Sequence, residues 1–229
     1  RFGRDLLRQV EGFEARLTGR KEHQPVVLAA GVGAWLYLLG PAIEAFQRET
    51  PQVPLKLWTR MGPQAVAAVR SGEAHVGVTS IGGDEVMADA DLKVEILAKV
   101  PHVLLLPDDH PLAAQTALEA SALEGAALVV PPRGRPLREA LEAFRPTARW
   151  TVAVEASGWP LMLHFVGLGL GWAVVNGFCP PPAGFVKRPL LDLPERVYLV
   201  VRRRELRDAT VDRLITLLTE PLLNRPMSR

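Results

Sequence analysis

The hydrophobic residues between Val26 and Ile81 follow two alternating periods, one typical of strands and one typical of helices. Short apolar runs predict three strands: Val26–Ala30, Val53–Trp58 and Val76–Val78. Apolar residues three or four positions apart lie between these runs and predict two helices: Leu39, Ile43 and Phe46, then Val66 and Val69. Because short strands that alternate with helices form βαβ units, the pattern predicts an α/β fold with a parallel sheet.

The same alternation continues and predicts a second α/β unit. Strands are expected at Leu92–Lys99, His102–Leu106, Leu128–Val130, Trp150–Val154, Trp172–Val175 and Val197–Val201. Helices are expected at 118–123, 137–144, 159–168 and 211–218. The pattern alone leaves open which lobe the last helix joins. We assign residues 25–100 and 188–229 to lobe I and residues 101–187 to lobe II, with two short crossings that form a hinge and a cleft.

A narrow apolar stripe is expected at the start of the chain, in Phe2, Leu6, Val10, Phe13 and Leu17. These residues are four, four, three and four positions apart, which is typical of a coiled-coil seam. A polar segment that ends at Pro25 separates the stripe from the first strand, so residues 1–24 are predicted to form a linker and dimerisation helix. We infer that residues 1–20 are the end of a longer helix from a bigger protein. The alternative is an ordinary amphipathic helix that packs on its own domain.

Composition and charge exclude several classes of function. The chain has 229 residues, enough for one large or two small domains, and 27 Lys and Arg against 25 Asp and Glu give a net charge of +2. So small a surplus creates no large field for nucleic acid, and this chain alone is not expected to bind DNA. Cys179 is the single cysteine, which excludes an internal disulfide. The most apolar window, Leu161–Val175, is too short and too rich in glycine to span a bilayer, so a cytoplasmic protein is expected.

None of the sequence patterns indicates a catalytic or metal centre. Gly31 and Gly33 follow a strand and precede a helix, but Leu36 stands where a dinucleotide loop has its third glycine, so a tight turn is the better interpretation. His102 and His110 lack the spacing of metal ligands, and no activated Ser or Cys motif accompanies the acidic residues before His110. We therefore expect no enzyme activity, no cofactor and no metal.

Three segments of the chain resemble the effector-binding part of LysR-type transcriptional regulators. The first is Leu39–Phe46 with Pro51–Leu55, and the second is Val69–Val78, which is similar to the family's entry to its third strand. The third combines the His-Pro-Leu-Ala turn at His110–Ala113 with the glycine-rich passage at Val166–Val175. The resemblance covers almost the whole chain.

The resemblance implies a two-lobed, type II periplasmic-binding-protein-like fold with a small-molecule effector between the lobes. It also implies a winged helix-turn-helix domain ahead of Arg1, and the regulator would contact DNA only through that domain. The resemblance further implies assembly into homodimers or homotetramers. In the dimer, the helix after Val32 is expected to pack against the Trp159–Leu168 helix of a partner. Family members often carry Ser or Thr at the start of the first cleft helix, where this chain has Gly33, Ala34 and Trp35 without a hydroxyl.

The candidate effector site follows from the rule that ligands bind beyond the carboxyl ends of the strands in an α/β sheet. The turns at these ends supply the expected site residues: Gly33, Ala34, Trp35, Met61, Gln64, Ser80, Arg133, Arg135, Trp159 and Asn176. Arg133 and Arg135 precede a helix, and they either bind an anion or are solvated loop residues. Trp35 and Trp159 either hold a flat or apolar ligand or complete the edge of a core. We expect a small, partly apolar effector, whose charged group, if it has one, is a carboxylate or a phosphate.

The expected function is ligand sensing and oligomerisation in a LysR-type transcriptional regulator, which controls transcription without chemistry of its own and without a membrane partner. A periplasmic solute-binding protein of an uptake system shares the fold and is the alternative. An enzyme on the same fold is the third candidate. Upstream sequence would separate the first two, because a winged helix-turn-helix supports the regulator and a signal peptide supports the uptake system.

Overall fold

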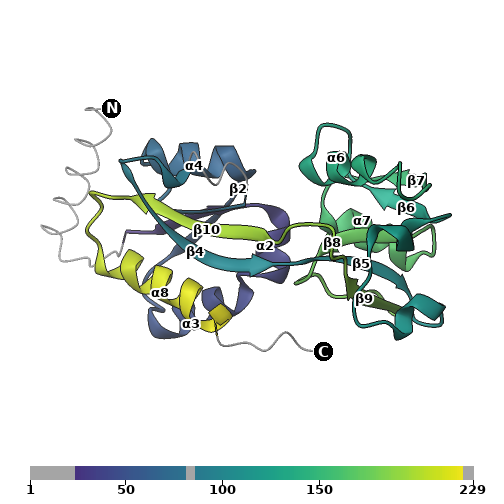
Figure 1. Ribbon diagram of the computed structural model, residues 1–229. Helices are drawn as coiled ribbons and strands as arrows, with labels where there is room; N and C mark the ends of the chain where they lie inside the picture. The colour runs from purple at the N-terminus through teal and green to yellow at the C-terminus, as the bar shows by residue number, and fades with distance from the viewer. Residues whose placement is uncertain (1–23, 81–85, 224–229) are drawn as a thin grey trace, which may run out of the picture.

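The computed structural model describes residues 24–80 and 86–223, so the predicted linker helix lies almost wholly outside the described residues. Figure 1 shows two α/β bodies, lobe I and lobe II, joined by two extended crossings of the chain. The predicted two-lobed α/β architecture is therefore confirmed. The residue limits given above for the two lobes stay a prediction.

Lobe I is built on a sheet with the strand order β2-β1-β3-β10-β4. The strands are β1 Val26–Ala30, β2 Leu55–Thr59, β3 Val76–Thr79, β4 Leu92–Val100 and β10 Arg196–Arg203. Strand β1 pairs in parallel with β2 and β3, as the βαβ pattern predicts. Strand β10 runs antiparallel to both β3 and β4, a direction that the sequence pattern did not specify. This direction arises because β10 enters lobe I from the hinge end, where β3 and β4 finish.

Helices cover both faces of this sheet (Figure 1). They are α2 Val32–Tyr37, α3 Gly40–Glu49, α4 Gly62–Arg70 and α8 Ala209–Leu223. Helices α3 and α8 pack together around the fully buried Phe46 and Leu214, while α4 buries Val66 and Val69 in a separate cluster. The Arg213 guanidinium donates to Glu49 at 2.6 Å and 2.7 Å, which joins α8 to α3. The last helix therefore belongs to lobe I, which the pattern had left open.

Lobe II contains two smaller sheets. Strands β5 His102–Pro107, β8 Ala173–Asn176 and β9 Phe185–Pro189 form an antiparallel sheet, and β6 Ala127–Val130 pairs in parallel with β7 Thr151–Glu155. The covering segments are the 3-10 helices η1 Pro111–Ala114 and η2 Ala120–Leu123 and the helices α6 Pro136–Ala143 and α7 Trp159–Gly167. Strand β9 was not predicted, because Lys187, Arg188 and Pro189 break its apolar pattern and all its residues stay half-buried.

The glycine-rich passage after α7 ends the helix and then lets two strands approach closely. Gly169 has φ +75°, and its N–H donates to the Val166 carbonyl at 2.8 Å. Leu170 N–H donates to the Phe165 carbonyl at 3.2 Å, which completes the capping pair of a left-handed helix end. A Cβ atom at Gly171 would lie 2.5 Å from the Ala127 carbonyl oxygen. Glycine is therefore required where the chain enters β8.

The hinge consists of the two crossings between the lobes. Pro101 separates β4 from β5, and residues 190–195 lead from β9 to β10. The buried His102 connects the crossings, because its carbonyl accepts from Leu190 N–H at 3.0 Å and its Nδ1 lies 3.0 Å from the Pro194 carbonyl oxygen. Burial lowers the pKa of His102, so its imidazole is neutral near neutral pH.

Candidate functional site

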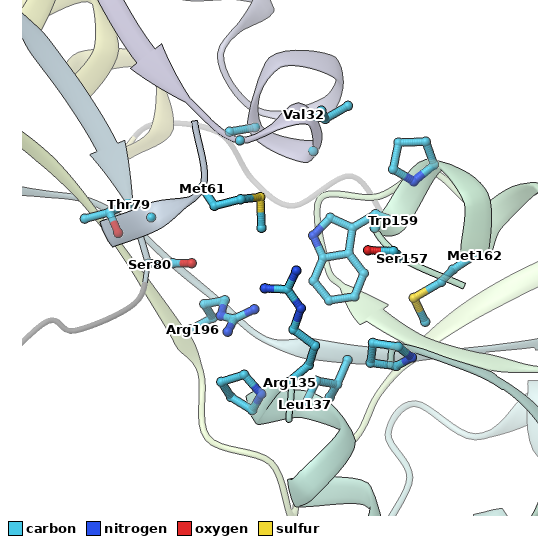
Figure 2. A pocket seen from close by; sticks show the side chains of 18 of the residues that line it. Val32, Met61, Thr79, Ser80, Arg135, Leu137, Ser157, Trp159, Met162 and Arg196 are labelled. Carbon is cyan, nitrogen blue, oxygen red and sulfur yellow. The ribbon is translucent and has the colours of Figure 1, made fainter. Parts of the chain in front are cut away.

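A cavity of about 420 Å³ lies between the lobes, where the carboxyl ends of the lobe I strands face lobe II. Lobe I contributes Gly31, Val32, Gly33, Ala34, Met61, Gly62, Val78, Thr79, Ser80, Arg196 and Tyr198. Lobe II contributes Pro131, Pro132, Arg135, Pro136, Leu137, Ser157, Gly158, Trp159, Pro160, Leu161 and Met162. Figure 2 shows these side chains converging on one space from both lobes. The size and the mixture of apolar walls with a few polar groups are typical of a small-molecule site.

The Trp159 ring of lobe II lies directly against the first turn of α2 in lobe I. A Cβ atom built at Gly33 would be 2.4 Å from Trp159 Cδ1 and 3.2 Å from Trp159 Nε1. Gly158, with φ +89°, turns the chain just before Trp159 and so sets the start of α7. The contact therefore depends on glycine at position 33, and it closes one side of the cavity.

Every charged side chain among the described lining residues belongs to an arginine. Arg135 is the residue that precedes α6 in lobe II, and Arg196 begins β10 in lobe I. The Arg135 guanidinium reaches into the middle of the cavity, near Met61 and Trp159, and the Arg196 guanidinium points into the same space (Figure 2). Within the described ranges, neither guanidinium has a hydrogen bond or an ion pair, and no carboxylate lines the cavity. The charge that the described residues bring to this end of the cavity is therefore positive.

Tyr198 forms the back of the cavity at the hinge. Its hydroxyl accepts a hydrogen bond from Asn176 Nδ2 and is also hydrogen-bonded to Ser80. Burial raises the pKa of Tyr198 to about 12, so the phenol is neutral. Because Ser80 and Tyr198 belong to lobe I and Asn176 to lobe II, this chain of hydrogen bonds links the cavity wall to both sides of the hinge.

The structure brings six of the ten predicted site residues to the cavity: Gly33, Ala34, Met61, Ser80, Arg135 and Trp159. The other four do not line it, each for a local reason. Trp35 packs against the core of lobe I, because it lies on the face of α2 that is turned toward the sheet. Gln64 is exposed and accepts from Met61 N–H at 3.3 Å, so its amide caps its own helix. Arg133 is exposed in the turn before Gly134, and it is absent from the residues that line the cavity.

Asn176 is the fourth residue away from the cavity wall. It is fully buried, and its hydrogen bond to Tyr198 holds it behind that ring. Arg196 and Tyr198 are lining residues that the sequence analysis missed. The sequence does contain a signal for them. Residues two apart on one strand share a face, and Arg196 and Tyr198 are two apart at the start of β10.

The described residues of the site are suited to binding a small molecule, and none of them is arranged for covalent chemistry. Within residues 24–80 and 86–223, no cluster of three or more His, Cys, Asp or Glu side chains could hold a metal ion. Cys179 is buried, and burial raises its pKa to about 12, so it is a thiol and a poor nucleophile. None of the helices in these ranges is both long and apolar enough to cross a membrane.

Two α/β lobes around a cavity with apolar walls define a two-lobed small-molecule-binding protein of the type II periplasmic-binding-protein-like class. A family comparison matches residues 19–222 to the LysR substrate binding domain. The chain therefore belongs to this family, the effector-binding domains of LysR-type transcriptional regulators, which is not an enzyme class. This match decides between the regulator and the periplasmic solute-binding protein in favour of the regulator.

Solved structures share the fold at low sequence identity. The cofactor-binding domain of the Cbl transcriptional regulator is 22% identical with a TM-score of 0.72, and the match covers 88% of this chain and 90% of that one. The reduced OxyR regulatory domain from Pseudomonas aeruginosa is 22% identical with a TM-score of 0.70, covering 87% and 98%. The BenM effector-binding domain with its effector benzoate is 16% identical with a TM-score of 0.68, covering 85% and 90%. No curated protein matches the chain.

Proposed function

We propose that this chain senses a small, partly apolar anion for a cytoplasmic LysR-type transcriptional regulator. The observation that carries the proposal is the cavity of about 420 Å³, whose walls come from both lobes and whose charged groups are arginines. Met61, Leu137 and Trp159 offer apolar surface, and Ser80 and Ser157 offer neutral hydrogen bonds. The BenM domain, which binds the aromatic anion benzoate, has the same fold and lends the proposal support.

Binding would act through the relative arrangement of the lobes. A ligand that touches both walls favours the arrangement in which both walls reach it, and it shifts the population toward that state. In the proposed regulator, this shift changes how dimers present separate winged helix-turn-helix domains to DNA. The net charge of +2 gives this chain no strong attraction of its own for nucleic acid.

Exposed apolar side chains on α2 and α7 support the proposed self-association. Leu36 on α2 is 58% exposed, and Leu161 on α7 and Leu168 just after it are 50% and 59% exposed. Apolar side chains this exposed on two neighbouring elements are typical of a protein–protein interface. We propose that α2 of one protomer packs against α7 of its partner, as in the dimer expected from the family resemblance.

Native mass spectrometry of the purified chain tests the sensing proposal. We expect a small molecule that remains bound in the gas phase, at one copy per chain, and that is released on unfolding. Trp159→Ala should lose this molecule, because the ring forms one wall of the cavity. Trp58→Ala is the matched control, because Trp58 lies on the edge strand β2, away from the cavity. Equal retention by both variants would place the ligand elsewhere.

A further inference from the structure

The two arginines of the cavity stand on different lobes. Arg135 is carried by lobe II at the start of α6, and Arg196 is carried by lobe I at the start of β10. Both side chains are partly buried and line the same cavity. A rotation of the lobes about the hinge therefore changes the separation of the two guanidinium groups.

The other buried or partly buried arginines that the structure describes are paired. The Arg138 guanidinium donates to Glu142 at 2.8 Å, Arg202 pairs with Asp212, and Arg188 donates to the Ala113 carbonyl at 3.0 Å. Arg135 and Arg196 have no such partner among the described residues, and each adds to the positive potential at the other. Like charges that share a poorly solvated space repel, and an anion between them would make the arrangement favourable.

We infer that one oxyanion group of the ligand binds between Arg135 and Arg196 and bridges the lobes, so that the charge of the ligand drives closure of the cleft. The inference rests on the proposed function and deepens it by naming the chemical class: one carboxylate or phosphate attached to an apolar body. A planar guanidinium can donate two parallel hydrogen bonds to such a group, which favours an oxyanion over a spherical ion. Met61, Leu137 and Trp159 line the same cavity as Arg135, and they would contact the apolar body (Figure 2).

Thermal melting of the full chain at constant ionic strength tests the inference with three probes: inorganic phosphate, benzoate and its neutral analogue benzamide. The variants are Arg135→Gln, Arg196→Gln and the double variant. Arg133→Gln is the matched control, because Arg133 is exposed in the same turn and does not line the cavity. We expect phosphate or benzoate to stabilise the wild type and the control, whereas benzamide does not.

Each single variant should weaken the apparent affinity by roughly tenfold or more, the scale of a lost charge-assisted hydrogen bond. Because both groups contact the same oxyanion, their contributions should be coupled, so the loss in the double variant should differ from the sum of the single losses. Stabilisation by phosphate identifies a phosphate-type ligand, and stabilisation by benzoate alone identifies a carboxylate on an apolar body.

Several results would overturn the inference. One is an anion response of the same size in Arg135→Gln or Arg196→Gln as in Arg133→Gln. Another is a double variant whose losses are the sum of the single losses, which means that the two arginines are not coupled through one oxyanion. Absence of any anion response in the wild type, or an equal response to benzamide, would also refute the role of charge. Native mass spectrometry separates this failure from that of ligand sensing. Sensing of a small molecule in the cleft would survive these results if a bound molecule is still lost from Trp159→Ala, and it would fail if no molecule binds at all.

Discussion

Substitution of Gly33 by alanine tests whether the two lobes meet where the structure places them. A Cβ atom at this position lies 2.4 Å from Trp159 Cδ1, so the ring must move by about 1 Å to reach the 3.4 Å of ordinary contact. Overpacking of this kind typically costs roughly 1–3 kcal/mol. Alanine also favours the helix by up to about 1 kcal/mol over glycine. If the lobes stayed fixed, the net loss of stability would be about 0–3 kcal/mol.

The clash can be relieved more cheaply, because Gly33 and Trp159 belong to different lobes and the hinge allows them to separate. We therefore expect Gly33→Ala to leave the melting temperature within about 4 °C of the wild type and to displace Trp159. Fluorine NMR of protein labelled with 5-fluorotryptophan reports this directly, since the chain has five Trp residues and Trp159→Phe assigns the resonance of interest. The Trp159 resonance should shift, and the other four should stay in place.

Gly31→Ala provides the matched control in the same turn. Its φ of −77° suits alanine, and nothing lies within 4 Å of the added Cβ atom. This variant should leave all five resonances unchanged. An unshifted Trp159 resonance in Gly33→Ala, or the same shift in Gly31→Ala, would refute the contact between the lobes.

Three further predictions concern stability and assembly. Burial depresses the pKa of His102 in the folded state, so the unfolded chain binds the proton more readily, and stability should fall as pH drops below about 6.5 toward the folded pKa. Urea titrations from pH 7.5 to 5 should show this loss of stability in the wild type and in the exposed control His164→Gln. The loss should be much smaller in His102→Gln. Gly171→Ala should destabilise the folded protein by roughly 2 kcal/mol or more, since the added Cβ atom meets the Ala127 carbonyl oxygen at 2.5 Å. In thermal melts, the control Gly125→Ala separates the steric cost from the backbone cost, because Gly125 has a positive φ but open space around it. Leu36→Glu and Leu168→Glu should each shift sedimentation from dimer to monomer at micromolar concentration. Leu191→Glu, which is similarly exposed but lies in the crossing after β9 and outside α2 and α7, should not. A dimer that survives both substitutions would place the interface elsewhere.

The fold could be predicted well where apolar runs and helical spacing are strong. Strand β1 is buried at every position, and Phe46 and Leu214 lie at core positions of their helices, so their patterns are unambiguous. Strand β9 was missed, because a half-buried strand with Lys187 and Arg188 has no apolar run to detect. The direction of β10 could not be predicted, because strand direction depends on which end of the sheet the chain re-enters.

The site could be predicted only at the level of turns. The rule of strand ends located the loops that hold Gly33, Met61 and Arg135, because it follows from chain direction alone. It could not determine which way a side chain points within a loop, so Trp35 was expected in the cavity and packs in the core. Arg196 was missed for a related reason, since its place depends on an antiparallel strand that returns from the other lobe.

The position of β10 in the sheet also bears on the order in which the protein can fold as it is synthesised. The strands of lobe II all lie between His102 and Pro189, so that lobe can form its sheets as soon as this segment has left the ribosome. Lobe I cannot, because β4 reaches the rest of its sheet only through β10, which is made about a hundred residues later. The nascent chain therefore carries a finished lobe II beside an open sheet edge on β3, and only the arrival of β10 covers that edge and joins β4 to the sheet.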